Sequence, residues 1–166
     1  MKSSDFTKSP AAPPPLIGAL LRVPYEAVRE HILARLHAAG FDDIDQAHFN
    51  VLQYPGPQGR RPSEVTAHAR VSKQAMNYLL NQLEERGYFE RHPDPDDARS
   101  KRIVLTRRGE AVRRTIRDAV TELERDWATR LGARRFAMLK RLLRELYDAR
   151  VQQAPSAAAR GKRRPA

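Results

Sequence analysis

The chain of 166 residues contains no cysteine. It can therefore form no disulfide, no thiolate metal site, no cysteine nucleophile and no thiol-based redox sensor. Long apolar runs are also missing: the stretch at residues 16–21 is too short to span a bilayer. The polar, proline-rich start shows no apolar region of a secretory signal peptide. We therefore expect a cytoplasmic, nucleoid-associated protein without membrane contacts.

Sequence patterns typical of catalysis are absent as well. There is no phosphate-binding glycine loop, nucleophile elbow or nucleotide-binding fingerprint. Asp42, Asp43 and Asp45 resemble acids at a helix start more than a catalytic pair. The histidines show no convincing ligand spacing; they are His31, His37, His48, His68 and His92. The sequence predicts a protein that is not an enzyme, binds no metal and uses no cofactor.

Positive charge is what the chain has in excess, with a formal net charge of +11. Such an excess favours encounter with polyanions, although ribosomal and membrane-surface proteins share it. Residues 1–15 and 153–166 carry little that could fill a core, and the second segment is basic. We expect both tails to be disordered, with a single domain over residues 16–152.

Apolar periodicity predicts a mainly α fold with one small β-hairpin. The expected helices are 24–40 (preceded by a turn or two that is kinked at Pro24), 44–54, 62–69, 72–87, a long helix from Thr106 to Gly132, and a last one over 133–147. Two strands are expected at 88–92 and 102–105. We expect residues 93–101 between them to form a long tip rather than a tight two-residue turn.

The two short helices at 62–69 and 72–87, joined by Arg70-Val71 and followed by a hairpin, form a winged helix-turn-helix pattern. Ser72 is expected to cap the second helix, whose buried face should comprise Ala75, Met76, Leu79, Leu80 and Leu83. The outward face should comprise Ser72, Lys73, Gln74, Asn77, Tyr78 and Asn81, without a carboxylate. We predict that this face reads DNA; a solvated helix face, the alternative, more often mixes Glu with Lys.

The hairpin tip carries basic side chains that a wing could bring to a flanking minor groove: His92, Arg99, Lys101 and Arg102. The tip also carries acids, Asp94, Asp96 and Asp97, which would repel DNA if they stood unpaired. We expect at least one of them, Asp97 foremost, to pair with an arginine and stiffen the loop. An ordinary solvated hairpin is the alternative.

Four stretches resemble the MarR family: 62–65, 71–76, 83–88 and 97–106, within a matching block of about 44–112. The most specific piece is Asp-x-Arg followed by an apolar strand ending in Leu-Thr. The resemblance implies a winged helix-turn-helix over about 44–106, a recognition helix over 72–85, and dimerisation helices over about 16–40 and 107–150. It also implies that Arg99 enters the minor groove and Asp97 supports the wing. Arg61 before Pro62 departs from the pattern, so we expect a weaker or different helix cap there.

Two further expectations concern partners. The apolar content of segments 16–36 and 112–147 exceeds what the winged domain can cover, which predicts a homodimer; coverage within a monomer is the alternative. The resemblance also implies a small aromatic or lipophilic effector. Six side chains could line its site, although ordinary core packing explains them better: Tyr25, Phe41, His48, Phe49, Tyr54 and Trp127.

Together these features predict a regulator that binds double-stranded DNA sequence-specifically, a repressor that occludes a promoter as a dimer on a pseudo-palindromic site. Base edges would be read by Gln74 and Asn77, with Lys73 and Tyr78 beside them. Ser72, Arg99 and Lys101 would serve phosphates or the minor groove. The rivals are a nonspecific architectural DNA-coating protein and a winged-helix protein-interaction module, whose exposed face would be apolar.

Overall fold

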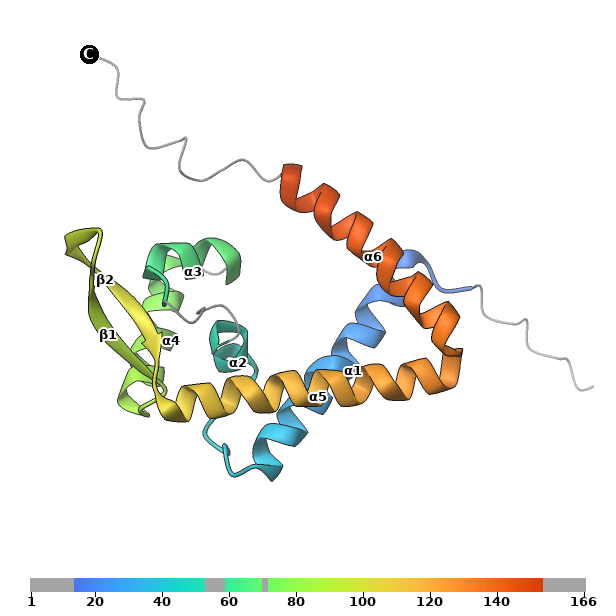
Figure 1. Ribbon diagram of the computed structural model, residues 1–166, viewed down its shortest axis with the longest axis horizontal. Helices are drawn as coiled ribbons and strands as arrows, with labels where there is room; N and C mark the ends of the chain where they lie inside the picture. Colours follow the sequence, from blue (N-terminus) through green and yellow to red (C-terminus); the bar gives the residue numbers. More distant parts are fainter. Residues whose placement is uncertain (1–13, 53–58, 70–71, 154–166) are drawn as a thin grey trace, which may run out of the picture.

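The computed structural model describes residues 14–52, 59–69 and 72–153, and shows a mainly helical chain with one antiparallel hairpin (Figure 1). In order, the elements are α1 (Ile17–Ala38), α2 (Gln46–Leu52), α3 (Pro62–Ala69), α4 (Lys73–Glu85), β1 (Phe89–Asp94), β2 (Asp97–Leu105), α5 (Arg107–Leu131) and α6 (Ala133–Gln153). Helices α2, α3 and α4 and the hairpin form one lobe at the start of α5, which we call the winged lobe. Helix α1 packs along α5, and α6 continues from its far end. The expected fold class is confirmed.

Helix α1 differs from the expectation, because it begins at Ile17 and runs through Pro24 without a break. A proline inside a helix cannot donate the hydrogen bond to the carbonyl four residues earlier, here that of Leu20. Both residues are exposed, so water can satisfy that carbonyl. The second half of α1 packs on α5 and buries Ile32 and Leu36, which anchors the helix.

Helix α2 begins at Gln46, two residues later than expected. Asp45 fixes its start, because one carboxylate oxygen accepts the backbone N–H groups of Ala47 (2.8 Å) and His48 (3.1 Å). The expected end at Tyr54 and the Pro/Gly-rich loop after it lie outside the described residues.

Helix α3 spans the expected 62–69. The different cap that Arg61 suggested is present: the Glu64 carboxylate accepts the backbone N–H of Arg61 (3.1 Å), and Pro62 has no N–H to satisfy. The Arg70-Val71 connection lies outside the described residues.

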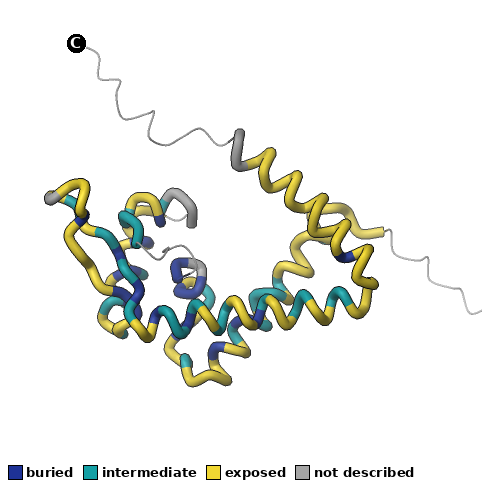
Figure 2. Tube along the Cα trace, viewed as in Figure 1, coloured by how far each residue is buried: buried dark blue, intermediate teal, exposed yellow. Residues whose placement is uncertain are grey.

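One core joins the winged lobe to the long helices. Its buried members are Ile32 and Leu36 of α1, Ile44 before α2, Phe49, Val51 and Leu52 of α2, Val65 of α3, Met76, Leu80 and Leu83 of α4, Tyr88, Phe89, Ile103 and Leu105 of the hairpin region, and Val112 and Ala119 of α5. Helix α6 contributes little, since it is exposed along most of its described length (Figure 2). No helix in the described part of the chain is both long and apolar enough to cross a membrane.

Candidate nucleic-acid interface

Helix α4 is fixed at its start and along one face. The Ser72 hydroxyl accepts the backbone N–H of Ala75 (3.1 Å), which confirms the expected cap. Met76, Leu80 and Leu83 are buried and Leu79 is half-buried, as expected. Ala75 is exposed, so its assignment to the buried face was wrong: it lies about 100° around the helix from Met76, beyond the edge of the apolar stripe.

The opposite face of α4 is polar and exposed. All six side chains expected there are exposed: Ser72, Lys73, Gln74, Asn77, Tyr78 and Asn81. None carries a carboxylate. The acids Glu84 and Glu85 stand at the far end, and Glu84 pairs with Arg91 of β1 (2.8 Å). The surface that α4 presents outward is therefore a set of hydrogen-bonding groups with one cation.

The hairpin is longer and its tip tighter than expected, because only Pro95 and Asp96 lie between the strands. The prediction of a long tip was wrong. Strand pairing runs from Phe89↔Leu105 to Pro93↔Lys101, then jumps to Asp94↔Asp97. Proline lacks the N–H that a regular ladder needs, and the jump leaves residues 98–100 as a bulge near the tip. Arg99 sits on this bulge, exposed.

Asp94 is the acid that ties the wing to the helices. Its side chain is buried and pairs with the Nε atoms of Arg61 (2.5 Å) and Arg102 (3.1 Å). The Arg61 hydrogen bond contributes most to lowering the pKa of Asp94 to about 2. The carboxylate also accepts the backbone N–H of Asp96 (3.0 Å), which closes the turn. Asp94 therefore holds the tip against the start of α3.

The other charges of the tip are arranged differently from the expectation. Asp96 pairs with Arg102 (2.7 Å), whereas the Asp97 carboxylate accepts the backbone N–H of Arg99 (3.1 Å). Among the described residues, arginine pairing in the wing thus falls to Asp94 and Asp96, not to Asp97. Arg102 is bound to these acids and His92 pairs with Glu90 (3.1 Å), so both are held within the wing.

The base of the wing is locked to α4 and α5. Thr106 caps α5 by accepting the N–H of Gly109 (3.1 Å), and its hydroxyl donates to the carbonyl of Gly87 (2.6 Å). A Cβ on Gly109 would lie 2.2 Å from the Tyr88 carbonyl oxygen, so only glycine permits this close approach. The Tyr88 hydroxyl donates to Asp43; burial, and then this bond, raise the pKa of Tyr88 to about 12.

A hollow of about 580 Å³ opens between α3, α4 and the wing. Its lining is Arg61, Pro62, Ser63, Lys73, Asn77, Asn81, Arg91, Arg99, Ser100 and Lys101, without an acidic residue. The hollow thus brings together five of the eight residues predicted to bind DNA: Lys73, Asn77, Asn81, Arg99 and Lys101. Ser72, Gln74 and Tyr78 lie outside this lining, exposed at the start and along the outer face of α4.

Five lining residues were not predicted to bind DNA by the sequence analysis: Arg61, Pro62, Ser63, Arg91 and Ser100. Strand alternation from buried Phe89 could have placed Arg91 on the α4 side, where it donates to the side-chain amide oxygen of Asn81 (2.6 Å). Arg61 and Ser63 give no comparable signal, because their place in the hollow depends on the packing of α3 against the wing.

The six side chains considered for an effector site do not share one cavity. His48 and Phe49 are buried in the core, and Phe41 packs against the ring of Tyr88. Tyr25 and Trp127 line a separate groove of about 680 Å³ formed by α1, α5 and α6. Tyr54 lies outside the described residues. His48, Phe49 and Phe41 therefore belong to the core, as expected, and the groove of Tyr25 and Trp127 is a separate feature.

Comparison with known proteins gives consistent matches. A MarR family model matches residues 42–100. The HTH-type transcriptional repressor Rv2887 of Mycobacterium tuberculosis is 33% identical over 88 residues, which are 53% of this chain and 63% of that protein. The chain therefore matches less than two thirds of the length of this curated relative.

Two solved structures extend the similarity over most of the chain. Apo MarR from E. coli is 25% identical with a TM-score of 0.65, covering 81% of this chain and 98% of that one. Rv2887 in complex with salicylic acid is 29% identical with a TM-score of 0.59 and the same coverage. The similarity thus includes the helices on both sides of the winged lobe.

Proposed function

From its similarity to MarR family proteins, we propose that the chain is a member of that family and a transcriptional regulator that binds double-stranded DNA sequence-specifically, as a homodimer and as a repressor. One observation carries the proposal. The polar, carboxylate-free face of α4 and the basic wing open onto the same acid-free hollow. A surface with this composition suits a partner that offers phosphate oxygens and base edges.

Each side chain of the interface has a role that its chemistry allows. The major groove is about 12 Å wide and accepts a helix. Gln74 and Asn77 can bond adenine in a bidentate manner, and Lys73 can donate to guanine. The Ser72 oxygen caps α4, while its hydroxyl proton can still be donated to a phosphate. Arg99, raised on the bulge of the wing, would enter the neighbouring minor groove, with Lys101 beside it on the backbone.

The homodimer is supported by where the apolar surface lies. Apart from Tyr78, the exposed large apolar residues of the described chain fall in residues 16–25 and 131–147: Leu16, Ile17, Leu20, Leu21, Val23, Tyr25, Leu131, Met138, Leu139, Leu142, Leu143, Leu146 and Tyr147. The helices of one chain leave this surface uncovered, which counts against coverage within a monomer. A two-fold partner would bury it and would place two α4 helices about one DNA turn apart on a pseudo-palindromic site.

We include an effector in the proposal: a small aromatic or lipophilic compound that releases the DNA. The support is the similarity to Rv2887, whose structure contains salicylic acid, together with the apolar groove of Tyr25 and Trp127. Titration with salicylate, followed by calorimetry and by DNA affinity, tests this part. Salicylate binding that leaves DNA affinity unchanged would remove the effector from the proposal.

Selection of bound fragments from the source genome tests the main proposal. We expect enrichment of a few sites that share a two-fold related sequence, with affinities at least about a thousandfold above those for random fragments at the same salt concentration. A difference below about tenfold would favour the architectural rival. No retention of duplex DNA at all would favour the protein-interaction rival.

A further inference from the structure

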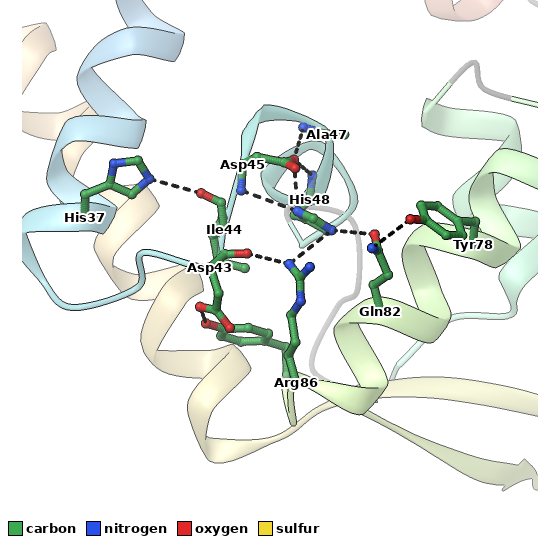
Figure 3. A network of polar contacts seen from close by, with 10 residues as sticks. His37, Asp43, Ile44, Asp45, Ala47, His48, Tyr78, Gln82 and Arg86 are labelled. Carbon is green, nitrogen blue, oxygen red and sulfur yellow. Dashed lines mark hydrogen bonds and ion pairs between the residues drawn. The ribbon is translucent and has the colours of Figure 1, made fainter.

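A chain of hydrogen bonds leads from the core of the winged lobe to the outer face of α4 (Figure 3). It begins at His48 of α2, whose side chain is only 3% exposed. Its Nδ1 lies 2.9 Å from a carboxylate oxygen of Asp45, and its Nε2 lies 3.0 Å from the amide oxygen of Gln82 on α4. The Gln82 amide nitrogen in turn donates to the hydroxyl of Tyr78 (3.1 Å). Tyr78 is 64% exposed on the face proposed to meet DNA.

This arrangement couples the hydrogen bonds to the protonation state of His48. The nearest group to each ring nitrogen is an oxygen, at 2.9 and 3.0 Å, and the Asp45 oxygen is fixed as an acceptor because it also caps α2. Two donors lie farther away, at 3.4 Å: the Asp45 backbone N–H at Nδ1 and Arg86 Nη1 at Nε2. A neutral imidazole has one N–H and can satisfy only one of the two shorter contacts, whereas the imidazolium donates at both. The shorter contacts thus match protonated His48 best.

If His48 were neutral, the donors and acceptors in the hydrogen bonds from His48 through Gln82 to Tyr78 would be reversed. Its remaining proton stays on Nδ1, where the bond to the Asp45 carboxylate is charge-assisted. Nε2 then needs a donor closer than Arg86 Nη1, which lies 3.4 Å away, and the Gln82 amide supplies one by turning through about 180°. The amide oxygen now faces Tyr78 and accepts its phenolic proton. In the protonated state Tyr78 can give that proton to an acceptor outside, and in the neutral state it can only accept.

We propose that His48 is a specificity-determining residue that acts through Gln82 and sets whether Tyr78 donates or accepts a hydrogen bond at DNA. The inference rests on the proposed DNA-binding function. Phosphate oxygens, guanine N7 and O6 and thymine O4 accept only, whereas the amino groups of cytosine and adenine donate. Protonation therefore favours phosphate, guanine or thymine at Tyr78, and deprotonation favours cytosine or the adenine amino group.

The charged groups around His48 differ in which state of the ring, imidazolium or neutral, they favour. Asp45 favours the imidazolium, whereas Arg86 at the end of α4, with Nη1 3.4 Å from Nε2, favours the neutral ring. Arg86 is itself held by the carbonyl of Asp43, whose carboxylate pairs with Arg108 of α5 (3.2 Å) and accepts from Tyr88. On α3, the Glu64 carboxylate bonds the N–H of Arg61. On the α1 side, His37 Nε2 lies 3.2 Å from the Ile44 carbonyl.

NMR on the free protein tests the chain without DNA. Nitrogen shifts of the His48 ring report which nitrogen carries a proton, and the Gln82 side-chain amide signals report its partners. In a pH series, we expect the Gln82 side-chain signals to change together with the His48 ring signals and at the same midpoint. In His48→Gln, which cannot titrate, they should stay constant. If the Gln82 signals did not change together with those of His48, the proposed hydrogen-bond chain would be wrong, whatever the protein binds.

Selection from a random duplex library at pH 6.0 and pH 8.0 tests the consequence at DNA. For wild type we expect one base position per half-site to change from guanine or thymine to cytosine or adenine, with about a fivefold change in relative affinity, as for one hydrogen bond. If Tyr78 meets a phosphate instead, binding relative to Tyr78→Phe should tighten about fivefold at pH 6.0 only. Tyr78→Phe and Gln82→Met should show neither effect.

Different outcomes would overturn the hydrogen-bond chain and the proposed DNA-binding function. Enrichment of a site with no pH dependence beyond that of Gln82→Met would overturn the chain and leave the regulator proposal standing. The same would follow if Gln82→Met kept the full wild-type shift. Failure to enrich any duplex at either pH would overturn the proposed function, and this consequence with it.

Discussion

The winged lobe and the two-helix arm formed by the first part of α1 and by α6 are built on opposite principles. The lobe buries its apolar residues within one chain and turns a polar surface outward. The arm exposes its apolar residues, with Leu146 63% and Leu16 82% exposed. A surface of that kind is costly in water. The contrast teaches that the lobe buries its apolar residues within one chain, whereas the proposed homodimer would be needed to cover those of the arm.

The largest effect is expected from charging the arm. The double variant Leu142→Glu, Leu146→Glu should give monomers at micromolar concentration, measured by sedimentation. DNA affinity should fall by about a hundredfold or more, because the two half-sites are no longer held together. Arg150→Glu, which changes the net charge by the same amount in the last turn of α6, should remain dimeric. A dimeric double variant would contradict the assignment of the arm.

Replacement of two glycines by alanine should have a smaller effect, with opposite signs, on stability. Gly109→Ala forces a Cβ against the Tyr88 carbonyl and should lower the free energy of unfolding by about 1–3 kcal/mol, as overpacking does. Gly18→Ala on α1 has nothing within 4 Å of its Cβ and should raise helix stability by up to about 1 kcal/mol. Denaturant titration of both variants measures the difference. Equal effects would mean that the junction of wing and α5 is loose.

The wing should contact DNA directly, whereas the far end of α5 should not. Arg99→Ala should weaken binding about tenfold across sequences and reduce the slope of log affinity against log salt by about one. Arg130→Ala, at the far end of α5 where Arg130 pairs with Asp126, should leave both quantities unchanged. Fluorescence anisotropy at several salt concentrations gives the two slopes. An unchanged slope for Arg99→Ala would show that the wing does not reach the duplex.

The smallest expected effect is on stability in acid. The pKa of Asp94 falls to about 2 in the folded chain because of Arg61 and its other donors. Its contribution to stability is thus complete above the unfolded pKa of about 3.9 and is lost as the pH falls towards 2. Asp94→Asn should unfold more easily near pH 6 and lose less stability between pH 4 and 2. Asp126→Asn, on the exposed end of α5, should keep the wild-type profile in thermal melts.

Local signals in the sequence predicted local structure well. Ser72 and Thr106 cap their helices as expected because a hydroxyl before a helix bonds an N–H three residues later, a contact that spacing alone determines. Gly132 ends α5 at a φ of +84°, which glycine allows. Six exposed residues of α4 followed from the period of the helix.

Features that depend on distant residues were missed. The tight turn of the wing exists because Arg61, from the start of α3, pairs with buried Asp94, and no pattern within 93–101 contains that information. The bond between His48 and Gln82 joins residues 34 apart. Ala75 was misassigned because hydropathy alone does not show where the edge of a buried stripe falls.

Hydroxyl-radical footprinting on a duplex selected by the protein tests the central claim most directly. The proposed dimer predicts two protected segments about one helical turn apart, in a complex of two chains per duplex, with both segments losing protection in the Leu142→Glu, Leu146→Glu variant. A single protected segment, or one chain per duplex at saturation, would contradict it.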